Sequence, residues 1–463
     1  MRRWVTAAAL LAAFAVTAGG CASAGASGPG APDGAATVVP SNAVAFVAAS
    51  TDLASPQWHG LGAFALKQLQ QQTKVDWSKD VQPLVGGEVD VAVLPGKQAI
   101  AFVQPPDSSK LAAFVKQHSL SSRVFGRWTA VAHSVSALDA VANARSHLSD
   151  ASAFADAMKA LPSGALVRAY VSGSQVQTLL QAVPLQLQTT LLPPGVRFKQ
   201  TPKPSALQKR FTVGVAAEAF PWLAAALIGT DHGLKLQAVA PDGPLASNVV
   251  PRYAIARTAP YTSALVDEIP SGALGVVDFK VPQGGLSSLP QSMLTKILGA
   301  HAADLVDQLD QVFGGETAIY IRPALPLPEV TIVTQPNDTT AASSSLDQLL
   351  TSLPKTGPLA GITLHRAVIG GQFVVSTTQA GIDAFRAGGA KLSADPTFVA
   401  AAKDAGMPTE TTGFAYADVK AALPLLALAG VKVPAGLPQL GAFFAYGADA
   451  DKQSTFSAFL GVG

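Results

Sequence analysis

The chain has 463 residues, of which 49% are hydrophobic and only 13% are charged, with 32 lysines and arginines against 30 aspartates and glutamates. This hydrophobic, weakly charged composition excludes an intrinsically disordered chain, and the balance of charge excludes a uniform basic surface that would bind nucleic acid. A single cysteine excludes both a framework of disulfide bonds and a metal site built from several thiolates.

The N-terminal segment has the layout of an export signal. Two arginines precede an apolar run from Trp4 to Thr17, which is followed by small residues and then by Cys21. The apolar run is shorter than the roughly 20 residues of a membrane-spanning helix, and this order of segments is typical of a secretory signal. Residues 1–20 are therefore predicted to be a lipoprotein signal peptide, with Cys21 as the lipidated (palmitate-bearing) residue. The alternative is an ordinary secreted protein with an incidental cysteine.

This signal predicts a protein anchored to the outer face of a bacterial cell membrane. Removing residues 1–20 takes away two basic residues and no acidic one, which leaves 30 of each sign. Such a body has no net attraction to anionic lipid headgroups, so the anchor must come mainly from the lipid. Residues 21–36, which are mainly Gly, Ala, Ser and Pro, are predicted to form a flexible tether.

The elements that follow predict an α+β fold. Ala43 to Ala49 is a short apolar run that indicates a buried strand, and residues 89–93 and 99–103 flank a Pro-Gly turn as a hairpin would. Asp395 precedes Pro396, as an N-cap precedes the first turn of a helix. Because the strands come partly as adjacent hairpins, we expect mainly antiparallel sheets with helices packed on one face.

The body of the chain contains an internal repeat, seen in five collinear matches. The matching pairs are Val39–Val44 with Ile269–Leu274, Val85–Glu88 with Phe313–Glu316, Val103–Asp107 with Val333–Asp338, Leu148–Lys159 with Leu392–Lys403, and Ala169–Tyr170 with Ala415–Tyr416. This order predicts two duplicated units, at 37–240 and 264–463. Residues 241–263, which begin with a proline-rich stretch, are predicted to be a linker.

The same motifs carry a resemblance to a known family. The Pro-x-x-Ala strand, the Gly-Gly-Glu before an apolar hairpin, the Pro-x-Asp turn and the Leu-Ser-x-x-x-x-Phe helix start resemble bacterial surface proteins grouped as domain of unknown function 3352. The resemblance covers most of the chain after the signal. It implies an exported or membrane-attached α+β protein, and it brings no activity and no catalytic residues.

A search for catalytic constellations identifies none. The chain lacks a His-Glu-x-x-His helix, a Gly-x-Ser-x-Gly elbow, a phosphate-binding loop and a dinucleotide-binding glycine motif. No two of its seven histidines are three to five residues apart, as a local metal site would need. Glu88 and Glu316 occupy matching places and are predicted to be structural. Asp90 matches Ala318, so we do not expect paired general acid and base chemistry to be repeated.

Three further patterns have ordinary explanations. Asp304, Asp307 and Asp310 are typical of one polar face of an amphipathic helix, and Asp449 to Asp451 of a polar turn. Ser352 to Lys355 matches a Ser-x-x-Lys motif, but its proline favours a loop over the helix start that such a nucleophile needs. The sequence therefore predicts no catalytic, cofactor-binding or metal-binding residue.

Two segments poor in charge, residues 176–196 and 421–440, follow the matching tyrosine strands. They are either helices buried against the sheet or the walls of a groove for an acyl chain or another protein. The sequence thus predicts a non-catalytic binding or scaffolding lipoprotein of the cell envelope, whose partner is an envelope protein or a lipid. The alternatives are a carrier of lipids or other amphiphiles and an envelope hydrolase whose residues converge only in space.

Overall fold

The computed structural model describes residues 34–73, 76–96, 98–173, 221–241, 259–281, 302–324, 328–336, 338–352, 363–428, 438–450 and 452–463. The predicted signal peptide, Cys21 and the apolar segment 176–196 lie outside these residues. None of the described helices is both long and apolar enough to span a membrane.

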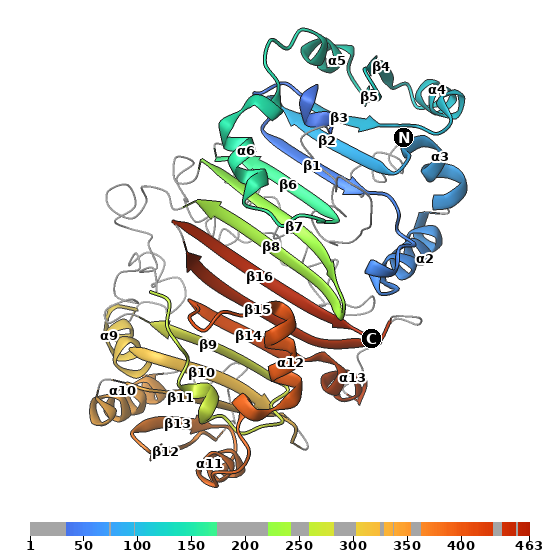
Figure 1. Cartoon of the computed structure of the whole chain (residues 1–463). Helices are drawn as coiled ribbons and strands as arrows, with labels where there is room; N and C mark the ends of the chain where they lie inside the picture. The colour runs from blue at the N-terminus through green and yellow to red at the C-terminus, as the bar shows by residue number, and fades with distance from the viewer. Residues whose placement is uncertain are drawn as a thin grey trace.

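The described strands form one continuous antiparallel sheet, which confirms the predicted α+β class (Figure 1). In chain order the strands are β1 (Ala45–Ser50), β2 (Glu88–Leu94), β3 (Gln98–Val103), β4 (Ser121–Phe125), β5 (Trp128–Ala132), β6 (Val167–Ser172), β7 (Trp222–Thr230), β8 (Gly233–Pro241), β9 (Gly275–Val281), β10 (Gly315–Arg322), β11 (Glu329–Thr334), β12 (His365–Ile369), β13 (Gln372–Ser376), β14 (Gly413–Asp418), β15 (Leu440–Ala450) and β16 (Gln453–Val462). The predicted hairpin is β2 and β3.

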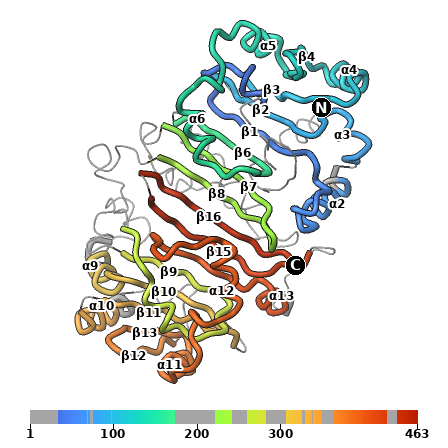
Figure 2. Tube along the Cα trace, viewed as in Figure 1, coloured from blue at the N-terminus to red at the C-terminus, as the bar shows by residue number. Residues whose placement is uncertain are grey.

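The strand order is the same in the two halves of the chain. From the outer edge to the middle it runs β4-β5-β3-β2-β1-β6-β7-β8 in the first half and β12-β13-β11-β10-β9-β14-β15-β16 in the second. The halves meet where β8 pairs with β16, and Figure 2 shows both strands in the middle of the sheet. The matching order is what a repeat requires, while the origin of the halves by duplication stays a prediction.

The helices lie on both faces of this sheet. In chain order they are η1 (Ala35–Thr37), η2 (Pro56–Trp58), α2 (Leu61–Thr73), η3 (Trp77–Val81), α3 (Gln82–Val85), α4 (Ser108–Gln117), α5 (Val135–Ala142), η4 (Leu148–Asp150), α6 (Ser152–Lys159), η6 (Leu265–Asp267), α9 (Ala302–Phe313), α10 (Thr339–Ser352), α11 (Gln379–Arg386), η7 (Leu392–Ala394), α12 (Pro396–Ala405) and α13 (Val419–Leu428). We call the face that packs against α5, α6, α11 and α12 the front face, which is toward the viewer in Figure 1.

The front face holds the main core of each half. Phe46 and Tyr170 pack against Phe154 of α6 in the first half, at ring-centroid distances of 5.6 and 5.2 Å. Phe398 of α12 packs in the same way on Tyr416 and Phe444 in the second half, at 5.2 and 5.5 Å. The two cores are thus built alike, with one aromatic ring from a helix seated on rings from the strands.

The prediction that the helices pack on one face differs from the structure. Leu84 of α3 and Leu111 of α4 pack against Val89 and Val103, which point to the back face. The reason is that β2 is buried on both sides, with Asp90 fully buried on its front face and Val89 buried on its back face. A strand that is buried on both sides must be covered on both.

Two boundaries also differ from the predicted tether and linker. Ala35 and Ala36, assigned to the tether, are fully buried in η1. Tyr261 and Ser263, assigned to the linker, are buried in the second half, where the backbone of Tyr261 exchanges two hydrogen bonds with Thr411. Both stretches end in groups that hydrogen-bond buried acids, which composition alone does not reveal: the backbone N–H of Ala35 donates to Asp90, and the hydroxyls of Tyr261 and Ser263 donate to Asp278.

The Gly-Gly-Glu motif gives a testable prediction about the first half. Gly86 has φ +75° and ψ −148°, a region that only glycine adopts readily, and a Cβ there would lie 2.2 Å from the carbonyl oxygen of Gln104. We expect Gly86→Ala to lower the free energy of unfolding by roughly 2–3 kcal/mol, measured by urea denaturation. Gly87→Ala is the matched control, because a Cβ at Gly87 meets nothing within 4 Å. Equal losses in the two variants would contradict this reading.

Candidate functional site

The second half buries a pair of acids on the front face, next to the point where the chain enters it. Asp278 on β9 faces Ala318 on β10, and Glu316 is two residues back along β10, so the two carboxyl groups are diagonal neighbours. Asp278 accepts hydrogen bonds from the hydroxyls of Tyr261 (2.5 Å) and Ser263 (3.1 Å). Glu316 accepts from the Ser263 hydroxyl (2.8 Å) and from two backbone N–H groups, those of Ala264 (3.1 Å) and Leu265 (2.9 Å).

Burial makes the charged form of this site costly. Asp278 is almost fully buried, and desolvation, opposed by the hydrogen bond from Tyr261, raises the pKa of its carboxyl to about 7. The neighbouring carboxyl of Glu316 raises the same pKa further. Burial and Asp278 also raise the pKa of the Tyr261 hydroxyl far above its usual range, so this hydroxyl stays a donor. Below about pH 7 the carboxyl of Asp278 is therefore mainly protonated.

The first half contains a counterpart of this pair on the other strand. Asp90 on β2 is fully buried and accepts a hydrogen bond from the backbone N–H of Ala35 at 3.0 Å. Burial raises the pKa of Asp90 well above its usual value, and Glu88 raises it further. Asp90 faces Ala48 across the β1–β2 ladder, whereas in the second half the acid faces the alanine from β9. Each half thus buries an aspartate that faces an alanine at the same pair of positions, but the aspartate is on β2 in the first half and on β9 in the second.

The expectation that paired acid and base chemistry is not repeated rested on matching Asp90 with Ala318 along the sequence. That match misses the buried Asp278, which lies 40 residues earlier and faces Ala318 across the sheet. The strand register is the signal that would have found it. Glu88 and Glu316, predicted to be structural, lie beside the acids at equivalent places. Both pairs bind the first turn of a 3-10 helix, η1 in one half and η6 in the other.

The strands carry almost no charged side chains on the back face of the sheet, in contrast to the front face with its buried acids. Directly opposite residues in an antiparallel pair share a face, so the registers assign every strand residue to one side. The twelve central strands are those that remain when the outer pairs β4–β5 and β12–β13 are set aside. Their charged side chains point to the front face, except Asp449 near the end of β15. The front-face charges are Glu88, Asp90, Arg168, Lys235, Asp278, Lys280, Glu316, Arg322, Glu329 and Asp418.

One patch of this back face is exposed around the junction of the two halves. We call it the apolar surface, and its residues are Leu236 on β8, Phe456 and Ala458 on β16, Ala415 on β14, Val277 on β9, and Ile319 and Ile321 on β10. Leu236 is 39% exposed, Val277 46%, Ile321 38% and Phe456 48%. Large apolar side chains that are gathered and exposed in this way mark a binding surface.

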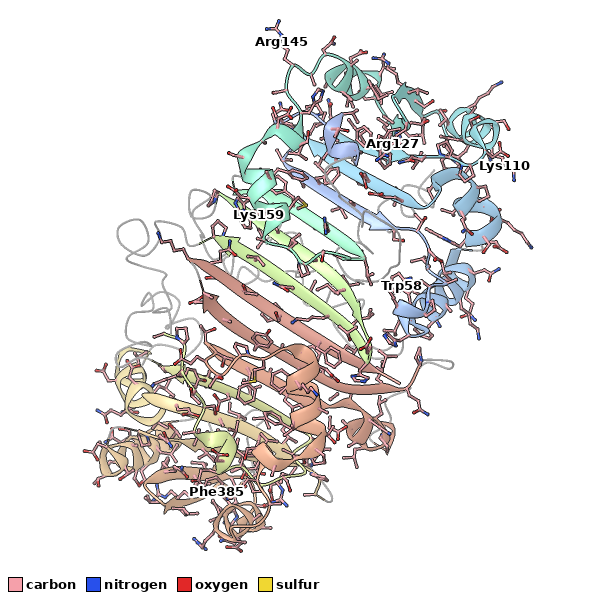
Figure 3. The ribbon with its side chains drawn as sticks, viewed as in Figure 1. Trp58, Lys110, Arg127, Arg145, Lys159 and Phe385 are labelled. Atoms are coloured by element: carbon pink, nitrogen blue, oxygen red, sulfur yellow. The ribbon has the colours of Figure 1, made fainter. Side chains whose placement is uncertain are left out.

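In the first half, a tryptophan covers the corresponding part of the back face. Trp58 of η2 packs with Leu227 and Leu234, and Figure 3 shows it beside α2, near the ends of β7 and β8. Val47, which is equivalent to Val277 in the repeat, is only partly exposed beneath this cluster. Within the described residues of the second half no tryptophan has this place. The exposed part of the apolar surface thus begins where the cover of η2 and α2 ends.

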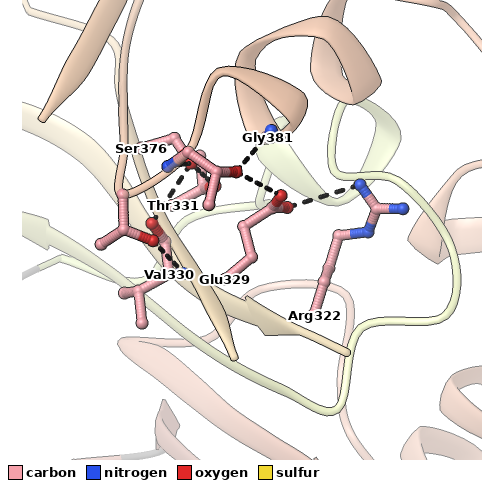
Figure 4. Close-up of polar contacts among 8 residues, drawn as sticks. Arg322, Glu329, Val330, Thr331, Ser376 and Gly381 are labelled. Atoms are coloured by element: carbon pink, nitrogen blue, oxygen red, sulfur yellow. Dashed lines mark hydrogen bonds and ion pairs between the residues drawn. The ribbon is translucent and has the colours of Figure 1, made fainter. Parts of the chain in front are cut away.

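A buried polar cluster near the edge of the second half has a structural role (Figure 4). Glu329 on β11 accepts a hydrogen bond from the Thr378 hydroxyl at 2.7 Å and pairs with Arg322 at 3.5 Å. Thr378 in turn caps α11 by accepting from the Gly381 backbone N–H at 3.0 Å. A Cβ at Gly381 would lie 2.1 Å from the Ser376 hydroxyl oxygen, so glycine is required there. The cluster positions α11, and no motif in the sequence indicates it.

The described histidines are dispersed. His59 bonds the carbonyl oxygen of Thr230 at 2.8 Å, and His232, in the turn before β8, bonds Asp404 of α12 at 3.0 Å. Within the part of the chain that the structure describes, no group of three or more His, Cys, Asp or Glu residues is placed to hold a metal ion. Asp307 and Asp310 lie on α9, and Asp449 lies near the end of β15. Ser352 is the last residue of α10, while Pro354 and Lys355 lie outside the described residues.

Of the two apolar segments, the second is described in part. Its first residues belong to α13, which begins after Asp418 caps it through the Ala421 N–H at 2.9 Å and which contains Pro424. This helix packs beside β14 and β15. Residues 429–437 of the segment, like all of 176–196, lie outside the described residues.

Comparison with known proteins shows similarity to solved structures alone. No family model matches the chain, and no curated protein matches it. Crystal form III of TP0453 is similar over 49% of this chain and 88% of that chain, with 13% identity and a TM-score of 0.26. Crystal form I of TP0453 covers 45% of this chain and 78% of that chain, with 12% identity and a TM-score of 0.24. A likeness of this extent does not bear on function.

Proposed function

We propose that this protein is an exported lipoprotein, anchored through Cys21, that binds the acyl chains of a lipid on its apolar surface. The observation that carries the proposal is the one-sided placement of charge. Ten charged side chains of the central strands point to the front face, whereas Phe456 and Leu236 are exposed on a back face where Asp449 is the one charged residue of these strands. An acyl chain fits such a surface because it needs apolar contact and offers no polar group to satisfy.

The chemistry of the acid pairs supports binding over catalysis. Asp278 and Glu316 are buried, and their oxygens accept hydrogen bonds from the hydroxyls and backbone N–H groups of the chain itself. A general acid or base must reach a substrate proton, directly or through one water. These carboxyls are instead occupied in holding η6. Membership of the domain of unknown function 3352 family belongs to the same proposal and rests on the sequence motifs.

One experiment tests both parts of the proposal. The full-length protein is extracted from its own membrane and measured by denaturing and then by native mass spectrometry. The denaturing mass should show acyl groups covalently added to the chain that begins at Cys21. The native mass should show a further lipid that is lost on denaturation. An unmodified denatured mass would contradict the anchor, and a native mass without lipid would contradict acyl-chain binding.

The apolar surface gives the binding prediction. We expect Phe456→Asp to weaken uptake of a fluorescent fatty acid by tenfold or more, because a carboxylate in contact with an acyl chain is poorly solvated. Val399→Asp is the matched control, since Val399 is similarly exposed, at 46%, but lies on α12 over the front face. Equal fatty-acid titration curves for the two variants would place the binding site elsewhere. A co-purifying protein partner without lipid would favour the scaffolding function instead.

A further inference from the structure

The second half begins at a segment that two carboxyl groups hold in place. Tyr261 is joined to Thr411 by two backbone hydrogen bonds, of 2.8 and 3.0 Å. The next donors are the hydroxyl of Ser263 and the backbone N–H groups of Ala264 and Leu265, all directed at Asp278 or Glu316. The contacts are therefore made by a segment of five residues, 261–265, against two adjacent strands. We call this arrangement the entry clasp.

Few charged groups surround the two acids of the clasp, which are both buried. Lys280 on β9 lies over the ring of Tyr261, 5.7 Å from the ring centroid. β14, on the other side of β9, presents the apolar Phe414 opposite Asp278, followed by Tyr416. The other titratable groups of the elements around the pair are Asp267 and Glu268 on or beside η6, Tyr320 and Arg322 on β10, and Asp418 at the end of β14. Lys280 is thus the cation nearest along the strand, set against two buried carboxyls.

We infer that the Asp278–Glu316 pair is a proton-dependent clasp, which holds residues 261–265 against β9 and β10 in acidic solution and loosens as the pH rises. While Asp278 holds its proton, only one carboxylate can be present in the pair, and four donors, two hydroxyls and two backbone N–H groups, satisfy the acids. Loss of that proton leaves two carboxylates side by side in a buried site, and these repel each other. Opening the segment to water relieves both the repulsion and the desolvation.

The direction of the pH effect follows from proton linkage. In the open segment both carboxyls are hydrated and titrate at the ordinary values for Asp and Glu, near 4. In the closed segment the pKa of Asp278 is about 7. Between these two values opening releases one proton, so the opening constant rises roughly tenfold for each pH unit. Above about pH 7 the proton is absent from both states, and the opening constant no longer changes.

Hydrogen exchange tests the inference on the two N–H groups that the clasp holds. Exchange of the Ala264 and Leu265 amides is measured from pH 5 to pH 8, under conditions where closing is faster than chemical exchange, and divided by the intrinsic rate at each pH. Their protection should fall by roughly tenfold per pH unit up to about pH 7 and then stay constant. In Asp278→Asn, which carries the neutral form at every pH, protection should not change over this range.

The controls separate the clasp from a general effect of pH. Asp383→Asn removes an exposed carboxylate of α11 that is not near the clasp, and it should keep the slope of the unchanged protein. If Asp278→Asn does not fold, Glu316→Gln serves in its place: it removes the repulsion but not the desolvation of Asp278, so the fall in protection should end at a lower pH than in the unchanged protein. Protection that is independent of pH in the unchanged protein would overturn the inference, and so would a full slope in a folded Asp278→Asn variant.

Discussion

Replacing Phe444 with alanine should lower the free energy of unfolding by about 3–5 kcal/mol. The ring is fully buried in the core of the second half, stacked on Phe414 at a centroid distance of 5.6 Å and tilted against Phe398 at 5.5 Å. Truncation removes its apolar contacts with both rings and leaves a cavity that rigid neighbours on strand and helix close only partly. Urea denaturation followed by circular dichroism measures the loss.

The control for this substitution is Val399→Ala on α12. Val399 is 46% exposed, although it follows the buried Phe398 directly, and its truncation should change stability by less than about 0.5 kcal/mol.

Because β8 and β16 pair over nine residue positions, we expect both halves to unfold in one transition. A loss below 1 kcal/mol for Phe444→Ala would mean that this core relaxes, and two separate transitions would mean that the halves unfold independently.

Replacing Glu316 with alanine should cost roughly 3 kcal/mol, the second largest effect. The side chain accepts hydrogen bonds from Ser263, Ala264 and Leu265, and its loss leaves two backbone N–H groups near the protein interior without their acceptor. Each unpaired buried donor costs about 1–3 kcal/mol. Release of residues 259–267 into water limits the total, so the loss is smaller than the sum over three bonds. Denaturation gives the magnitude, and exchange of the Leu265 amide shows whether the segment has opened.

Glu316→Gln is the matched control, because the amide keeps one acceptor oxygen while removing the charge beside Asp278. It should retain most of the stability that Glu316→Ala loses. A glutamine variant as unstable as the alanine variant would show that the negative charge of Glu316 stabilises the clasp. The argument that repulsion weakens it at high pH would then fail.

Local elements were predictable where neighbouring residues determine them. Asp395 was predicted to cap a helix, and it accepts hydrogen bonds from the N–H groups of Thr397 and Phe398 at the start of α12. The predicted hairpin is β2 and β3, and the predicted first strand is β1 with a shift at its start. The repeat in the sequence predicted that the order of elements would recur, and the strand order does recur.

The acid pairs and the apolar surface were not predictable in this way. Asp278 meets Glu316 because β9 lies beside β10, and Leu236 shares a face with Phe456 because β8 lies beside β16. These contacts join residues 38 and 220 positions apart by number, and a slip of one residue in either register would send the side chains to the opposite face. Periodicity within a strand shows that two faces exist, but it does not say which strand lies next to it.

The sequence by itself thus determined the α+β class, the recurring order of elements and the helix caps, because these depend on contacts within a few residues. The tertiary structure alone decided that the two halves share one sheet, that helices cover both faces, and that nearly all the charged side chains of the central strands point to the front face. The physical reason is that strand pairing over long separations sets which side chains become neighbours, and the burial of those neighbours sets the charge that each can carry. The acid of the entry clasp and the exposed Phe456 are both consequences of that pairing.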